Sequence, residues 1–275
     1  FELCRTADTV AAMHDFAFVI AGFFVGLVVG LTGVGGGSLM TPLLIFGFGI
    51  KPYLAIGTDL LFAAGTKFGG TVASARAKLI DWRVVGLLSL GSIPAALATI
   101  YVLHTLGPAN PDVQHIMTTT LGLALILTAL ATLYKAIRGK NIPRSIAPED
   151  LRKASTPRHW ALPVLFGAAI GTLVSISSVG AGAIGVTVLM LLYPALPLPR
   201  IVAADIAYAV PLTLVAGLGH ASIGSVDWPL LLKLLAGSIP GIYLGSRLVL
   251  KTPDRVIRSL LSVLLAYAGI KLIAI

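Results

Sequence analysis

Apolar residues in this chain form long blocks that are separated by short polar stretches. The blocks fall into two sets of five, and a polar stretch over 138–159 divides the sets. Several blocks approach or exceed the about 20 apolar residues that a helix needs to cross a hydrocarbon core of about 30 Å. The pattern therefore predicts an all-α, polytopic membrane protein. The expected segments are 16–32, 37–49, 53–75, 83–104, 114–137, 160–176, 183–194, 199–221, 228–249 and 255–275.

Composition agrees with a membrane protein and excludes an ordinary soluble domain. Hydrophobic residues make up 57% of the chain and charged residues 11%, whereas soluble domains average about 45–50% and about 25%. The net charge of +9 does not indicate a nucleic-acid partner, because Lys and Arg gather in a few short loops between apolar blocks. A single cysteine, Cys4, excludes an internal disulfide framework.

The first two blocks of each set are short and interrupted. Phe16 to Ile50 spans 35 residues, which is too long for one spanning helix and too short for two with a turn. A glycine-rich run over 33–37 interrupts this stretch, and 175–182 interrupts its counterpart. Short, glycine-broken segments at matching positions of two halves indicate a transporter binding site. We therefore expect paired short helices that meet near the middle of the membrane.

The chain also repeats itself at a constant spacing of 146 residues. The spacing relates five pairs: Gly36 and Gly182, Thr41 and Thr187, Asp59 and Asp205, Asp81 and Asp227, and Gly91 and Gly237. A spacing that holds without a gap over some sixty residues indicates a duplicated unit. The predicted organisation is an N-terminal tail at 1–15, a first membrane repeat at 16–137, a basic linker at 138–159 and a second membrane repeat at 160–275.

The distribution of Lys and Arg predicts the orientation of the loops, because cytoplasmic loops carry an excess of these residues. The loop after the third segment, the central linker and the loop before the last segment are basic, whereas 105–113 and 222–229 contain no Lys or Arg. The loop at Asp81 is therefore expected inside and its equivalent at Asp227 outside. This predicts inverted repeats, with both termini on the periplasmic side and the linker in the cytoplasm.

The residues at the two helix breaks are candidates for binding a small anion. Helix N-termini supply partial positive charge, and glycines before them let an oxyanion approach the backbone. The expected substrate-binding residues are Gly35, Gly36, Gly37, Ser38, Thr41, Ser177, Ser178, Gly180, Ala181 and Gly182. The alternative is that these small residues only allow close helix packing.

Three charged residues inside the membrane segments are candidates for ion coupling or for the pathway. Asp59 and Asp205 are costly in a membrane, so we expect them to carry protons or to cap helix breaks, and the sequence leaves both interpretations open. Lys67 either attracts the anion or extends to the membrane surface, and the second interpretation is favoured because only about eight residues separate it from Arg76.

The run GLVVGLTGVGGGSLMTPLL, over 26–44, resembles the opening motif of the TauE/SafE family of sulfite exporter-like proteins. The Gly57-Thr58 step, the Asp-Trp step at 81–82 and the Gly-Ser-Ile-Pro run at 91–94 look similar too, so the resemblance extends over 16–275. It implies movement of small sulfur-containing anions, such as sulfite, sulfoacetate or sulfonates, across a bacterial inner membrane. The chain departs from the family pattern in its thinner second glycine run and in Asp59 and Asp205.

The sequence thus predicts a secondary transporter that exports such an anion by alternating access, with proton coupling left open. No enzyme activity, cofactor or metal is expected, and the absence of a Walker-type motif gives the chain no nucleotide motor of its own. The expected partners are the anion and the lipid bilayer, with protons as well where transport is coupled to them. The sequence leaves open whether the protein forms an oligomer. The alternatives are an anion channel and an intramembrane aspartyl protease that uses Asp59 and Asp205.

Overall fold

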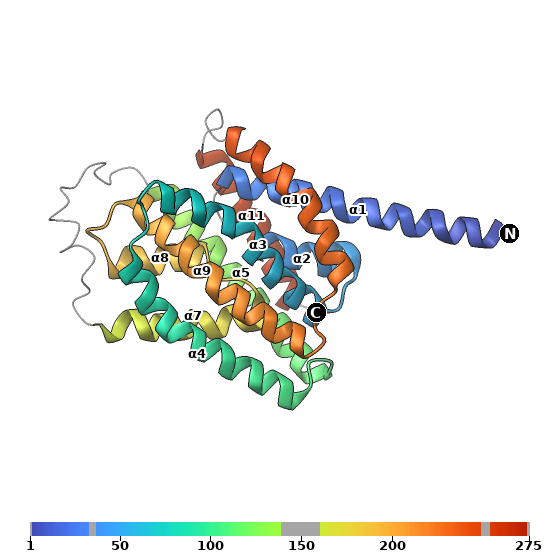
Figure 1. Cartoon of the computed structure of the whole chain (residues 1–275), viewed down its shortest axis with the longest axis horizontal. Helices are drawn as coiled ribbons and strands as arrows, with labels where there is room; N and C mark the ends of the chain where they lie inside the picture. Colours follow the sequence, from blue (N-terminus) through green and yellow to red (C-terminus); the bar gives the residue numbers. More distant parts are fainter. Residues whose placement is uncertain (1, 33–36, 139–159, 249–253, 274–275) are drawn as a thin grey trace.

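The computed structural model describes residues 2–32, 37–138, 160–248 and 254–273. Every regular element in these ranges is an α-helix, as predicted, and the helices pack side by side (Figure 1). The ten described helices are α1 (Glu2–Thr32), α2 (Gly37–Phe48), α3 (Pro52–Arg76), α4 (Trp82–Leu106), α5 (Pro111–Arg138), α7 (Ala161–Ser177), α8 (Ala183–Leu192), α9 (Leu198–Ser222), α10 (Trp228–Leu248) and α11 (Asp254–Ile273). Their bounds lie within three residues of the expected segments, except that α1 begins well before residue 16.

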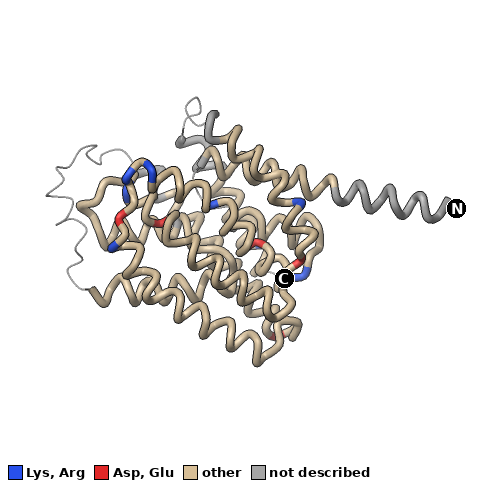
Figure 2. Tube along the Cα trace, in the orientation of Figure 1, with Lys and Arg blue, Asp and Glu red and all other residues tan. Residues whose placement is uncertain are grey.

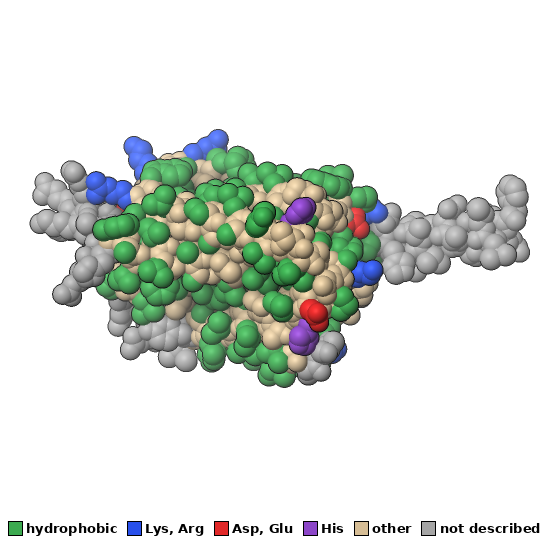
Figure 3. Space-filling model, turned by 90° about the horizontal axis from the view of Figure 1, so that it is seen from below, with side chains coloured by type: hydrophobic (Ala, Val, Ile, Leu, Met, Phe, Trp, Pro, Cys, Tyr) green, Lys and Arg blue, Asp and Glu red, His purple; other side chains and the backbone are tan. Residues whose placement is uncertain are grey.

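The outer surface of the bundle is apolar. Large hydrophobic side chains such as Leu90, Tyr101 and Leu165 are more than 60% exposed, and hydrophobic residues spread over the face seen in Figure 3. Lys, Arg, Asp and Glu gather mainly toward the two ends of the described bundle (Figure 2). Among the described residues, the helices long and apolar enough to cross a membrane are Trp82–Leu106, Pro111–Leu133, Leu198–Ser222 and Trp228–Gly245. A surface of this kind is stable in lipid and not in water.

The repeated Asp-Trp step starts a helix in both places. The Asp81 carboxylate accepts a hydrogen bond from the backbone N–H of Arg83 at 3.1 Å, and the Asp227 carboxylate accepts one from Leu230 at 3.0 Å. Aspartate before the first helical turn satisfies backbone donors that would otherwise have no partner inside the helix. The tryptophan that follows is exposed in both cases, as expected at a membrane surface.

Glycines let helices from the two sequence halves touch along their backbones. A Cβ on Gly91 of α4 would overlap the carbonyl oxygen of Val164 in α7, and a Cβ on Gly237 of α10 would overlap that of Val19 in α1. Small residues at such crossings replace the hydrophobic effect, which does not drive association between helices in lipid. The main helix pairs are α1 with α10, α4 with α7, α3 with α9 and α5 with α11.

The glycine contacts also give the relative directions of these helices. In the α3–α9 pair, Leu61 lies against Gly217, and the Thr71 hydroxyl lies 3.5 Å from the carbonyl oxygen of Ile206. Residue numbers rise along α3 as they fall along α9, so these two helices are antiparallel. In the α1–α10 and α4–α7 pairs the residue numbers rise together, so α1 is parallel to α10 and α4 to α7. Those contacts are Gly22 with Leu234, Gly26 with Ser238, Gly167 with Leu88 and Gly171 with Ser92.

We predict that Gly91→Ala destabilises the protein, whereas Gly86→Ala in the same helix does not. An added methyl at Gly91 would press on the backbone of α7, and overpacking of this kind costs about 1–3 kcal/mol. No atom lies within 4 Å of a Cβ built on Gly86. The midpoint of thermal unfolding in detergent measures both effects, and equal midpoints for the two variants would contradict the close packing of α4 on α7.

Candidate functional site

The second predicted helix break lies between α7 and α8. Ser178 ends α7 in the left-handed region with φ 58°, and Gly180 and Gly182 have φ values of 129° and 147°. Glycine adopts such angles without the steric cost that other residues meet. α7 and α8 are 17 and 10 residues long, so the expected short, glycine-broken pair is confirmed here.

The first predicted break falls on residues 33–36, so the binding role expected for Gly35 and Gly36 lies outside the described residues. Gly37 begins α2, a helix of 12 residues. Like its counterpart α8, this helix is too short to cross a membrane alone.

Asp59 connects three elements of the bundle. Its side chain is fully buried on α3, and its Oδ2 atom accepts hydrogen bonds from the Thr41 hydroxyl of α2 and from the Ser178 hydroxyl at 2.9 Å. The backbone of Thr41 also interacts with this carboxylate. The Oδ1 atom is buried and has no hydrogen-bond partner in the described part of the chain. Asp59 therefore fixes α2 and the α7–α8 break relative to α3.

Lys67 lies inside the protein and not at the membrane surface. Its side chain is 7% exposed, and its ammonium donates a 2.6 Å hydrogen bond to the carbonyl oxygen of Ala181 in the α7–α8 break. It interacts electrostatically with both Asp205 and Asp59. The favoured sequence interpretation, in which Lys67 extends to the inner surface, is wrong because α3 directs this side chain toward the break.

Asp205 occupies the corresponding place in the second half of the chain. It is 2% exposed on α9, and its Oδ1 atom lies where a Cβ on Gly185 of α8 would collide with it. Asp59 lies against α2 through Thr41 in the same way. Gly185 was not among the predicted site residues, although its position in the first turn of α8, beside the glycine break, was a usable signal.

The predicted hydroxyl donors behave differently from one another. Thr41 and Ser178 face Asp59, whereas the Ser177 hydroxyl donates to the Leu173 carbonyl of its own helix at 2.7 Å. Ser38 is buried and lines a separate groove beside α1 and α11. The structure thus brings Thr41, Ser178 and Ala181 together with the three charged residues, and contact of any of them with substrate stays a prediction.

A buried histidine that was not among the predicted site residues lies near the α7–α8 break. His220 of α9 is fully buried, and its Nε2 atom lies 2.9 Å from the Ser175 carbonyl oxygen in α7. Next to it, a Cβ on Gly57 would overlap the carbonyl oxygen of Ser225. The Thr58 hydroxyl accepts a 3.0 Å hydrogen bond from the backbone N–H of Asp227. These contacts close α3 against the α9–α10 loop, which explains the Gly57-Thr58 step.

We predict that Thr41→Val lowers stability, whereas Thr99→Val has little effect. The first change removes a donor from a buried carboxylate, which costs about 1–3 kcal/mol or more. Thr99 only donates to Ala95 in its own helix. Unfolding midpoints in detergent distinguish the two variants. A Thr41→Val protein as stable as the parent would show that this hydrogen bond does not hold α2 in place.

Comparison with known proteins finds similar sequences over nearly the whole chain. The chain matches the family described as "Sulfite exporter TauE/SafE" over residues 18–272. It is 35% identical over 257 residues to the "Probable membrane transporter protein YjnA" of Bacillus subtilis, covering 94% of this chain and 99% of the relative.

Two more distant relatives give the same picture. "Probable membrane transporter protein YdhB" of Bacillus subtilis is 27% identical, with 93% of this chain and 98% of the relative covered. "Probable membrane transporter protein MJ0441" of Methanocaldococcus jannaschii is 28% identical, with 92% of each covered. No solved structure matches the chain significantly. The predicted resemblance is confirmed, and the protease alternative is wrong because the match is to transporters. The chain is a multi-pass membrane protein that belongs to the TauE/SafE family of transporters.

Proposed function

We propose that the protein is a secondary transporter that exports a small sulfur-containing oxyanion, such as sulfite, sulfoacetate or a sulfonate, across a bacterial inner membrane. The observation that carries this proposal is the position of Lys67, which is buried inside the bundle and bonded to a helix break. Ionisable residues inside a membrane bundle are costly, so they mark substrate or ion pathways. A buried ammonium at a backbone break supplies the positive charge that an anion needs in the low dielectric of the bundle.

The α7–α8 break offers the anion a second kind of interaction. α8 begins directly after Gly182, and the free N–H groups of a helix N-terminus carry a partial positive charge of roughly half a unit. In the proposed complex, the oxyanion replaces the Ala181 carbonyl as the partner of Lys67 and accepts hydrogen bonds at the start of α8. The existing 2.6 Å bond to Ala181 then keeps Lys67 at the break while the site is empty.

The charges at this site give a reason for proton coupling. Asp59 and Asp205 together with Lys67 carry a net charge of −1 when all three are ionised, which opposes the entry of an anion. Protonation of one aspartate makes the group neutral and lets the ammonium attract the substrate. We therefore propose that a proton and the anion occupy the site together and move in the same direction.

Alternating access is proposed to follow from two inverted repeats, 16–137 and 160–275. Gly91 of α4 packs on α7 in the way that Gly237 of α10 packs on α1, and these glycines are equivalent at the 146-residue spacing. α3 and its equivalent α9 are antiparallel, which supports opposite orientations of the two halves in the membrane. With the linker at 138–159 in the cytoplasm, both termini would lie on the periplasmic side.

Transport by the purified protein in liposomes tests the proposed function. We expect saturable flux of at least one anion among sulfite, sulfate, thiosulfate and short sulfonates, and faster flux when a proton gradient points along the direction of anion movement. A channel would instead show flux that does not saturate and no acceleration by substrate on the opposite side.

We predict that Lys67→Gln reduces this flux at least tenfold, because a hydrogen bond to a charged group contributes about 1.5–3 kcal/mol. Lys51→Gln serves as the matched control, since Lys51 is exposed at the start of α3. Asp59→Asn should leave flux that no longer responds to the proton gradient. Undiminished flux in folded Lys67→Gln protein would remove this site from the mechanism.

We predict that cysteines at Ala77 and Ser222 react with a membrane-impermeant reagent from opposite sides of the membrane. Both residues are exposed: Ala77 directly follows α3 and Ser222 is the last residue of α9, so they precede the equivalent helices α4 and α10. The labelling uses a Cys4→Ser background, since Cys4 is the single native cysteine. Labelling of both positions from the same side would rule out inverted repeats while leaving the binding site as proposed.

A further inference from the structure

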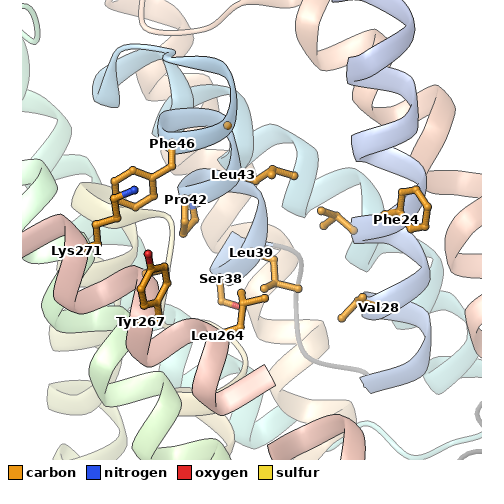
Figure 4. Close-up of a pocket in the computed structure, with 13 residues that line it drawn as sticks. Phe24, Val28, Ser38, Leu39, Pro42, Leu43, Phe46, Leu264, Tyr267 and Lys271 are labelled. Carbon is orange, nitrogen blue, oxygen red and sulfur yellow. The ribbon is translucent and has the colours of Figure 1, made fainter. Parts of the chain in front are cut away.

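A groove of about 480 Å³ lies between α1, α2 and α11, away from Asp59 and Lys67. Its walls are mainly apolar, and Figure 4 shows the side chains from α1, α2 and α11 that line it. The groove opens to the surface of the bundle, because Phe24, Leu264 and Tyr267 in its walls are each more than half exposed. In a membrane this surface faces lipid, so the groove is accessible from the bilayer.

The length of the groove matches one leaflet. It follows α2 from Ser38 to Gly47, and nine residues of helix rise about 13.5 Å. Half of a hydrocarbon core of about 30 Å is about 15 Å. α2 ends at Phe48 and α11 at Ile273, so one end of the groove lies near the last turns of both helices. The other end lies at the first turn of α2, which the sequence predicts to be near the middle of the membrane.

A cation marks the end of the groove that is closest to the helix ends. Lys271 lies in the last turn of α11, and its ammonium is 4.9 Å from the centre of the Phe46 ring. Figure 4 shows the Lys271 side chain beside this ring and next to Tyr267. No acidic side chain is found among the described residues that line the groove. The groove therefore combines an apolar trough with a positive charge at its surface end.

We propose that this groove binds one acyl chain of an anionic phospholipid, with the phosphate of the headgroup at Lys271. An apolar trough that remained unfilled would lose dispersion contacts along its whole wall, and water would find few polar partners there. An acyl chain that lies along α2 fills the trough to the depth where it ends. The phosphate next to Lys271 distinguishes an anionic lipid from a neutral one.

Photo-crosslinking tests the proposal on the full, detergent-purified chain. Phosphatidylglycerol or phosphatidylcholine with a diazirine on one acyl chain is added at matched concentrations, and the labelled peptides are mapped by mass spectrometry. We expect phosphatidylglycerol to label peptides of α2 and α11 in preference to other exposed helices. Labelling spread evenly over all exposed helices would overturn the proposal.

Two pairs of variants separate the acyl chain from the headgroup. Leu264→Trp fills the groove and should abolish the preferential labelling, whereas Val263→Trp, at an exposed neighbour that does not line the groove, should retain it. Lys271→Gln should weaken labelling by phosphatidylglycerol about fivefold, which corresponds to about 1 kcal/mol for one cation near the headgroups, and leave phosphatidylcholine unchanged. Lys51→Gln is its control.

The remaining outcomes are also decisive. Size-exclusion profiles show whether Leu264→Trp is folded, and Lys271→Gln tests the headgroup site independently if it is not. Equal labelling by the two lipids in the parent protein would overturn the anionic headgroup. Cross-links between α11 helices of two chains, with lipid excluded, would show that a second copy of the protein covers this groove.

Discussion

A charge inside a hydrocarbon layer must be stabilised by the protein itself, because lipid supplies neither water nor counter-ions. Asp59 and Lys67 meet this requirement with partners from distant parts of the chain. Asp59 receives hydroxyl groups from α2 and from the α7–α8 break, and Lys67 donates to the carbonyl oxygen of Ala181 in the same break. The two short helices, which cannot cross a membrane alone, are thereby held against α3. The arrangement of α2, α3 and the α7–α8 break around Asp59 and Lys67 depends on these few polar contacts.

Close backbone contact between the long helices supports the buried polar residues at this site. α4 lies on α7 at Gly91, and α10 lies on α1 at Gly237, so each half of the chain is packed against a helix from the other half. In lipid these contacts supply dispersion energy where burial of apolar surface gives no gain. The long helices therefore form a frame, and α2 and α8 pack into it through buried apolar side chains such as Leu44 and Leu189 as well as through the buried polar groups.

The sequence predicted the helices well because their signal is local: blocks of apolar residues have the length of a membrane crossing, and Asp81 and Asp227 stand directly before two of them. It also singled out Thr41 and Ser178 as binding candidates and Asp59 as a coupling candidate, and the structure brings these three residues together. It failed for Lys67 and did not place His220 among the site residues, because the direction of a side chain round a helix depends on which helix packs beside it. The apolar pattern of a single sequence does not show which helix of one half packs on which helix of the other half.

The two halves are not equivalent at the site, and this difference bears on direction. Lys67 has Thr213 at the equivalent position of α9, and the Thr213 hydroxyl donates to Ala209 in its own helix at 2.8 Å. The proposed pathway therefore has one ammonium, which is carried by α3 and bonded to the α7–α8 break. When the halves exchange roles in the proposed cycle, the cation remains with the first half. The anion then has a different electrostatic environment in the two access states, so one fold with near-symmetric packing can still favour release on one side.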